Sequence, residues 1–174
     1  MKLIHVALKQ EAKPIIEHFK LICKQVKPYK IYQKDDIVLV ICGMGKKNTL
    51  KIKTIFEKYD IKMAISIGIA GCKDRDIQIG TIFCTNHKLK YMHYTTLTTV
   101  NAPLENKESL KTTLVDMEAE VFLSTCKKFL DIKDIYILKV VSDYLDTTIP
   151  KKEFVWKIIE KNLKNISKVV TLQN

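Results

Sequence analysis

Ile37-Val38-Leu39-Val40-Ile41 is an unbroken apolar run that ends just before Gly43. A short run that is apolar on both faces is typical of a strand in a sheet that helices cover on both sides. The runs Met63–Ile69 and Ile135–Val141 have the same character. The sequence therefore predicts an α/β fold in which helices flank a central, mixed but mostly parallel, twisted sheet, giving three layers.

Helical spacing of apolar residues alternates with these runs. Strands are expected at Leu3–Leu8, Ile37–Cys42, Met63–Ile69, Thr81–Thr85, Thr95–Val100 and Ile135–Val141. Helices are expected at Glu11–Cys23, Thr49–Tyr59, Phe122–Leu130 and Lys152–Val170. With 174 residues, of which 47% are hydrophobic, the chain has the size and apolar content of a single domain that spans 1–174.

The formal net charge of +11 raises nucleic acid as a partner, but the basic residues argue against it. Arg75 is the only arginine, and the lysines are spread along the whole chain. Phosphate and base readout favours the guanidinium group, so we expect a lysine-rich, solvated surface and no nucleic-acid partner. No apolar stretch is long enough for a signal peptide or a membrane span, which predicts a cytoplasmic protein. The five cysteines are odd in number and widely separated, and are expected to be reduced packing residues.

Glycines follow two of the expected strands: Gly43 and Gly45 follow one, and Gly68 and Gly71 follow the next. We expect tight turns there, at the carboxyl edge of the sheet where open α/β folds bind ligands. The spacing does not match the dinucleotide fingerprint or the Walker phosphate loop. The four histidines are scattered and no metal-binding spacing occurs, so no metal is expected.

Three acidic residues also lie near strand ends, namely Glu11, Glu118 and Asp143. If the strands are parallel neighbours, these carboxylates meet at the rim of one pocket, which suits a reaction that develops positive charge and needs a proton donor. Structural roles are the alternative: Asp143 as a turn cap and Glu11 as a solvated residue at a helix start.

The segment Leu114-Val115-Asp116-Met117-Glu118-Ala119-Glu120 enters a predicted helix with several carboxylates. In the structural alternative, Asp116 caps this helix and Glu118 decorates its first turn.

The chain resembles the nucleoside phosphorylase and nucleosidase superfamily, particularly the 5′-methylthioadenosine/S-adenosylhomocysteine nucleosidases and the hopanoid-linked phosphorylases. The matching pieces occur in family order and cover most of the chain as far as Asp146. They are Ala7–Glu11, Gly43–Lys46, Ser66–Gly71, Val115–Ala119 and Val141–Asp146. The Val-Asp-Met-Glu and Ser-Asp elements are the most specific of them.

The resemblance implies a nucleoside phosphorylase-like fold and cleavage of the N-glycosidic bond of a purine nucleoside, without a cofactor. In this reaction Asp143, next to Ser142, would protonate the departing base, and Glu11 would activate water. Glu118 would bind the ribose hydroxyls, with Met117 against the sugar face. A turn at Ala70 and Gly71 would line the site. The resemblance also implies a homodimer.

Two departures leave alternatives open. The region between Asn86 and Leu114 is shorter than in the family, so a nucleoside-binding member without turnover is a second hypothesis. A phosphorylase using phosphate as co-substrate is a third, and Lys46 or Lys139, which replaces a family arginine, would then attract the phosphate. Arginine pairs that grip phosphate are absent, which favours hydrolysis.

Overall fold

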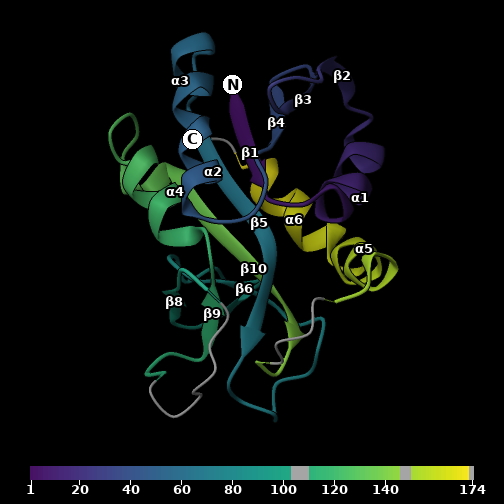
Figure 1. Ribbon diagram of the computed structural model, residues 1–174, viewed down its shortest axis with the longest axis vertical. Helices are drawn as coiled ribbons and strands as arrows, with labels where there is room; N and C mark the ends of the chain where they lie inside the picture. Colours follow the sequence, from purple (N-terminus) through teal and green to yellow (C-terminus); the bar gives the residue numbers. More distant parts are fainter. Residues whose placement is uncertain (103–109, 146–149, 173–174) are drawn as a thin grey trace.

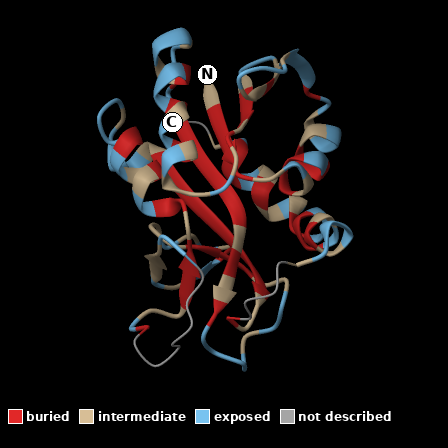
Figure 2. Cartoon of the chain, in the orientation of Figure 1, coloured by how far each residue is buried: buried red, intermediate tan, exposed pale blue. Residues whose placement is uncertain are grey.

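The computed structural model describes residues 1–102, 110–145 and 150–172. Within these residues ten strands form one mixed sheet, whose main path runs β2-β3-β4-β1-β5-β10-β6-β7 (Figure 1). Its centre is a parallel set in the order β4-β1-β5-β10. The predicted α/β class with a mixed, mostly parallel sheet is therefore confirmed. Both hydrophobic faces of the central strands are covered, as Figure 2 shows by their burial.

Antiparallel pairs extend the sheet at both edges. β2 and β3 form a hairpin that pairs with β4, β6 runs antiparallel to β10, and β9 pairs with the end of β5. The strands are β1 (Lys2–Val6), β2 (Ile22–Gln25), β3 (Lys30–Lys34), β4 (Ile37–Ile41), β5 (Met63–Cys72), β6 (Ile82–Cys84), β7 (His93–Tyr94), β8 (Leu97–Thr99), β9 (Leu114–Asp116) and β10 (Ile135–Asp143).

Helices cover the sheet in two separate layers (Figure 1). One layer holds α1, α5 and α6, which pack on a cluster that includes Ile4, Ile65 and Leu138. The other holds α3 and α4, which pack on Leu3, Val38 and their neighbours. The helices are α1 (Lys9–Phe19), α2 (Lys46–Thr49), α3 (Lys53–Lys58), α4 (Ala119–Cys126), α5 (Lys152–Lys161) and α6 (Leu163–Val170), with 3₁₀ turns η1 (Leu50–Ile52) and η2 (Ile132–Asp134).

The bounds of all four predicted helices are corrected. The helix expected at Phe122–Leu130 runs from Ala119 to Cys126, because its start is set by the residues that precede Phe122. The helix expected to reach Cys23 ends at Phe19, because Lys20 takes a left-handed conformation, and the chain continues as β2. The helix expected at Thr49–Tyr59 is divided by η1. The closing helix is divided at Asn162, whose side-chain amide donates to the carbonyl oxygens of Ile158 and Gly80.

Two further expectations are wrong, one about a turn and one about the packing of a cysteine. Gly68, Ala70 and Gly71 lie inside β5, which runs on to Cys72 because its end pairs with β9, so they do not form the expected turn. Cys23 is exposed on the edge strand β2, although the other four cysteines are buried as expected.

The side chain of Phe122 joins α4 to the sheet. It is fully buried and stacks on the His5 ring of β1, with 5.3 Å between ring centroids. His5 contacts the Ser66 hydroxyl through Nδ1, and burial, aided by the charge of Lys139, lowers the pKa of His5 to about 3. The imidazole is therefore neutral, and the stack is a packing contact.

Replacing Phe122 by alanine should lower the free energy of unfolding by about 3–5 kcal/mol, because it opens a cavity beneath α4. Urea denaturation measures the change. Phe129→Ala is the matched control: that ring is 43% exposed and stacks on Phe56, so its loss should cost about 1 kcal/mol. Equal losses in the two variants would contradict this account of the α4 interface.

Candidate active site

Glu11 has a buried carboxylate that three backbone amides hold in place. Its Oε2 accepts hydrogen bonds from the N–H groups of Ala7 (3.1 Å) and Leu8 (2.8 Å), and its Oε1 accepts one from Ile69 (3.1 Å). Leu8 is the N-cap of α1, so the carboxylate turns back to the cap amide as the acidic residue of a capping box does. Glu11 is thus fixed between the residues that follow β1 and the middle of β5. The alternative in which Glu11 is a solvated residue at a helix start is wrong.

Burial raises the pKa of Glu11 from its ordinary value of 4.5 to about 7. The amides of Leu8 and Ile69 and the positive charge of Lys139 act in the opposite direction, but desolvation outweighs them. Such a carboxyl group gains and loses its proton near neutral pH, which is the property required of a general base.

Lys139 lies in the middle of β10 with its side chain only 2% exposed. Its Nζ forms an ion pair of 2.7 Å with Oδ2 of Asp116, which is also buried. Burial opposes the charge on both groups, yet the pair raises the pKa of Lys139 and lowers that of Asp116. Both groups therefore stay charged inside the protein.

Asp116 also organises the start of α4. Its Oδ2 accepts hydrogen bonds from the N–H groups of Ala119 (2.9 Å) and Glu118 (3.3 Å). The Asp116 side chain therefore satisfies amides at the helix start, as predicted, although it lies two residues before the N-cap position. Its Oδ1 accepts a hydrogen bond of 2.7 Å from the Thr99 hydroxyl of β8. One carboxylate thus joins β8, β10 and the first turn of α4.

Glu118 is buried and is the N-cap residue of α4, so it does not merely decorate the first turn. Its Oε1 accepts a hydrogen bond of 2.8 Å from the N–H of Gly45. That amide is available because Gly43 and Gly45 both adopt positive φ angles, +93° and +87°, in the turn after β4. The predicted glycine turn at this strand end is confirmed.

Glu11, Asp116, Glu118 and Lys139 form what we call the buried charge cluster. Lys139 interacts electrostatically with all three carboxylates. A β-carbon added to Gly68 of β5 would lie 3.1 Å from Oε1 of Glu11 and 3.3 Å from Nζ of Lys139. The absent side chain at Gly68 is therefore what allows the carboxylate and the ammonium group to approach the same side of β5.

Asp143, the third predicted acid, ends β10. The register between β10 and β5 shifts at Ser142, so that Asp143 pairs with Gly71. The Ser142 hydroxyl donates to Oδ2 of Asp143 and lies 3.3 Å from the carbonyl oxygen of Ala70. A β-carbon at Gly71 would lie 3.1 Å from Oδ1 of Asp143, so this carboxylate also approaches the β5 backbone. Such a bulge re-aims the side chain at the strand end.

The structure places the predicted residues in two groups. Glu11 and Glu118 belong to the buried charge cluster, near Gly68. Asp143 lies beside Gly71, three residues further along β5, which is about 10 Å for an extended strand. Met117, half-buried, is in the short link between β9 and α4. The carboxylates therefore follow one strand and do not meet at a point.

The ion pair between Asp116 and Lys139 lies beyond what the sequence analysis assigns. Asp116 and Lys139 are far apart in the sequence, so no local pattern in the sequence indicates their ion pair.

The alternative in which Lys46 or Lys139 attracts phosphate meets an obstacle, because Lys139 is paired with Asp116 and Lys46 is paired with Glu120 at 2.8 Å. The family motif carried over to Asp146 runs past residue 145, so its last residue lies outside the described residues.

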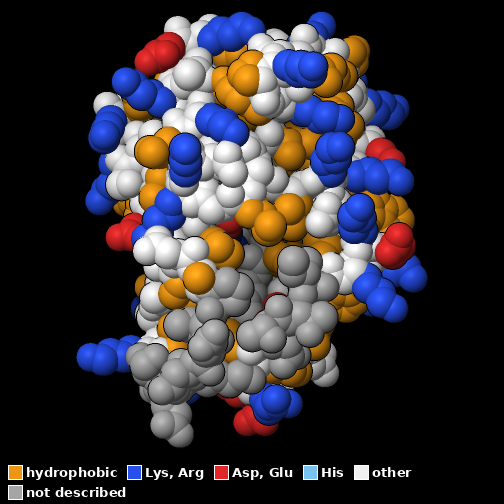
Figure 3. All heavy atoms as spheres, viewed as in Figure 1, with side chains coloured by type: hydrophobic (Ala, Val, Ile, Leu, Met, Phe, Trp, Pro, Cys, Tyr) orange, Lys and Arg blue, Asp and Glu red, His pale blue; other side chains and the backbone are white. Residues whose placement is uncertain are grey.

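The described residues give little support to a nucleic-acid surface, a metal site or a membrane-spanning helix. On the face drawn in Figure 3, lysine and arginine side chains are scattered, and acidic side chains are visible in a hollow near the centre. Across residues 1–102, 110–145 and 150–172, no group of three His, Cys, Asp or Glu could hold a metal ion. In the same residues every helix is too short or too polar to cross a bilayer.

Replacing Lys139 by methionine should lower the free energy of unfolding by about 3–5 kcal/mol, because it leaves the Asp116 carboxylate buried without its counter-ion. In the double variant with Asp116→Asn the loss should be smaller than the sum of the two single losses. Urea denaturation of all variants measures this coupling. Lys46→Met, which removes a partly exposed pair, is the control and should cost under about 1 kcal/mol. Strictly additive losses would refute the buried ion pair.

Glu11 should make the protein less stable as the pH rises. Its pKa in the folded protein, about 7, exceeds the ordinary 4.5, so between these values the folded state binds the extra proton and the free energy of unfolding falls with pH. The fall attributable to Glu11 is about 3 kcal/mol. Denaturation of the wild type and of Glu11→Gln from pH 4.5 to 8 should give a difference that grows over this range. The exposed Glu17→Gln is the control, and a difference for Glu11→Gln that stays constant would count against the raised pKa.

Comparisons with known proteins give relatives by structure only. No family model and no curated protein matches the sequence. Among solved structures, a futalosine hydrolase mutant of Helicobacter pylori is similar with a TM-score of 0.81 at 15% identity, covering 97% of each chain. The 5′-methylthioadenosine/S-adenosylhomocysteine nucleosidase of Helicobacter pylori, bound to butyl-thio-DADMe-Immucillin-A, gives 0.81 at 16%, again over 97% of each chain. That of Neisseria meningitidis, bound to methylthio-immucillin-A, gives 0.79 at 14% over the same shares. The chain therefore has the fold of these nucleosidases and of futalosine hydrolase.

Proposed function

We propose that the chain hydrolyses the N-glycosidic bond of a purine nucleoside and releases the free base. The observation that carries this proposal is the buried Glu11 carboxyl, held by three amides, with a pKa raised to about 7 beside Lys139 and Glu118. A carboxyl group in this state is suited to deprotonating water at neutral pH. The nucleosidase fold and the bound nucleoside analogues of its structural neighbours support the same reaction class.

In this proposal Glu11 activates the attacking water. Its Oε1 and the Nζ of Lys139 both lie close to the backbone of Gly68. A water molecule hydrogen-bonded to Oε1 would lose its proton to the carboxylate, and the nearby ammonium group would help to orient it. Lys139 would act as a positioning residue, since its charge also favours the ionised form of Glu11.

Glu118 is proposed to bind the ribose. Among the described residues its Oε1 has the Gly45 amide as a partner and its Oε2 has none, so the second oxygen can accept hydrogen bonds from sugar hydroxyls. The carboxylate would also stabilise the positive charge that develops on the sugar as the glycosidic bond breaks. Met117, the preceding residue, would pack against the sugar face.

Asp143 is proposed as the acid that protonates the departing base. It lies about 10 Å from the Glu11 end of the site along β5, as expected if water attacks the sugar at one end and the base leaves at the other. Ser142 orients its carboxyl, and the backbone of Ala70 and Gly71 would line the space between. A neutral leaving base needs this proton because its anion is a poor leaving group.

Water is favoured over phosphate as the second substrate. The ammonium groups of Lys46 and Lys139 are engaged by Glu120 and Asp116, so neither is a free charge for an anion. Asp116 and Glu118 would also repel phosphate at this position. The proposal includes no cofactor. It also includes a homodimer, from the resemblance, and the cytoplasmic location expected from the sequence.

The substrate class follows from a direct assay. The protein is incubated with 5′-methylthioadenosine, S-adenosylhomocysteine, futalosine, adenosine and inosine, with and without phosphate, and free base is separated and quantified. Hydrolysis predicts base release that does not depend on phosphate. Release only with phosphate would instead assign a phosphorylase, and stabilisation by nucleosides without any release would assign a binding protein.

Glu11→Gln and Asp143→Asn should each reduce kcat by about 10²–10⁴-fold, because each removes one proton-transfer group. Steady-state kinetics on the best substrate measures the loss. Glu17→Gln, on the same helix as Glu11 but exposed, and the exposed Asp131→Asn are the matched controls and should keep full activity. Full activity in either site variant would remove that residue from the mechanism.

A further inference from the structure

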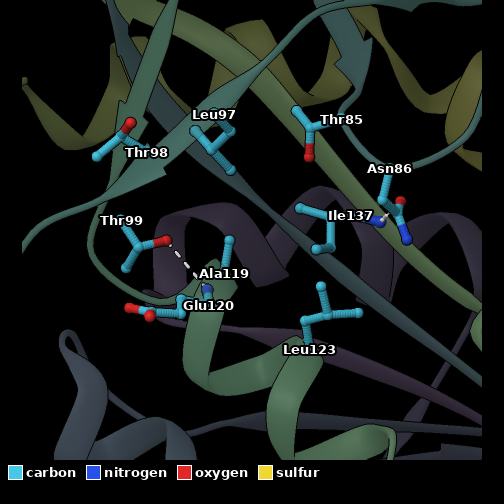
Figure 4. A pocket seen from close by; sticks show the side chains of 9 residues that line it. All are labelled: Thr85, Asn86, Leu97, Thr98, Thr99, Ala119, Glu120, Leu123 and Ile137. Carbon is cyan, nitrogen blue, oxygen red and sulfur yellow. Dashed lines mark hydrogen bonds between the residues drawn. The ribbon is translucent and has the colours of Figure 1, made fainter. Parts of the chain in front are cut away.

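A cavity of about 390 Å³ lies beside the first turns of α4. Three walls surround it in Figure 4: β8, the first turns of α4, and the residues that follow β6 together with the start of β10. The lining residues are Thr85, Asn86, Leu97, Thr98, Thr99, Ala119, Glu120, Leu123 and Ile137. None of the residues proposed above for catalysis or nucleoside binding is among them. Its volume falls within the range of small-molecule pockets, roughly 300–1,000 Å³.

The lining indicates what kind of molecule fits. Leu97, Leu123 and Ile137 provide apolar surface, and the view in Figure 4 shows them around the middle of the cavity. The Thr85 hydroxyl lies at the rim and makes no hydrogen bond to a described residue, so it can bond an occupant. Glu120 is the charged lining residue. Its carboxylate repels an anion, and its ion pair with Lys46 through Oε2 weakens its attraction for a cation.

We propose that this cavity is a second binding site, separate from the buried charge cluster, for a small uncharged molecule with an apolar body and one hydroxyl or amide group. The proposal goes beyond nucleoside hydrolysis and does not depend on it.

The site is connected to the cluster through Thr99. Thr99 lines the cavity, and its hydroxyl donates to Oδ1 of Asp116 at 2.7 Å and accepts a hydrogen bond of 3.0 Å from the N–H of Glu120. Asp116 in turn holds Lys139. An occupant that contacts Thr99 therefore changes the surroundings of the carboxylate on which the cluster depends.

Benzyl alcohol serves as the probe, with benzoate as a charged molecule of similar size. Titration followed by ¹H–¹⁵N NMR should give saturable shifts at the amides of β8 and of the first turns of α4, with a Kd on the order of 1 mM for benzyl alcohol and binding at least about tenfold weaker for benzoate. No saturable shift, shifts centred elsewhere, or equal affinity for benzoate would overturn the proposal.

Variants test the location. Thr85→Phe should fill the cavity and weaken binding at least about tenfold, whereas Thr85→Ser, which keeps the hydroxyl and does not fill the cavity, should change Kd by less than about threefold. Leu97→Phe fills the cavity from β8 and replaces Thr85→Phe if that variant does not fold. Unchanged affinity in a folded filling variant would place the probe elsewhere and overturn the proposal.

The connection to the cluster has its own readout, which needs no enzymatic activity. The side-chain ¹³C signal of Asp116 should move on saturation with benzyl alcohol in the wild type and in Thr99→Ser, which keeps the hydroxyl, and should stay unmoved in Thr99→Val. An Asp116 signal that does not respond in the wild type would overturn the connection. Base release is assayed separately in each variant, so failure of this proposal and failure of the proposed function are distinguishable.

Discussion

The ion pair between Lys139 and Asp116 is the interaction on which the site depends. Two charges are almost fully buried in a sheet whose central strands are mostly apolar, and such burial is tolerated only when each charge has close partners. Asp116 meets this requirement with a lysine, a threonine hydroxyl and two backbone amides. The pair also fixes where α4 begins, and therefore where Glu118 lies.

The remaining acids are placed by the same physical requirement that buried polar groups be hydrogen-bonded. Glu11 satisfies the amides at the start of α1 and one amide of β5, and Glu118 satisfies the glycine turn after β4. Each carboxylate thus stabilises the local backbone and presents charge to the same region. A structural role and a chemical role are compatible here, since the contacts that hold the side chains leave Oε2 of Glu118 with no partner among the described residues.

The central sheet was predictable because its strands are apolar on both faces and contrast with their flanks. The edge hairpin was not, since β2 is an exposed strand of mixed composition, and Ile22 and Cys23 there continue the helical spacing of α1. The break at Asn162 depends on a hydrogen bond to Gly80, which is distant in the sequence. Local patterns cannot reveal such a partner.

The candidate site was predictable in its residues and less so in its arrangement. Glu11, Glu118 and Asp143 were found from their positions near strand ends and from the family motifs. The ion pair of Lys139, the bulge that aims Asp143 at β5, and the close approach permitted by Gly68 all arise from pairing between distant segments. These features appear only when the strands are assembled.

A crystal structure of the protein with methylthio-immucillin-A tests the central claim most directly, because this compound binds a nucleosidase of the same fold. The account predicts that the sugar-like ring contacts Glu118 and lies near Glu11, with the base-like ring beside Asp143. An inhibitor bound away from these three carboxylates, or crystals in which it does not bind at saturating concentration, would contradict the account.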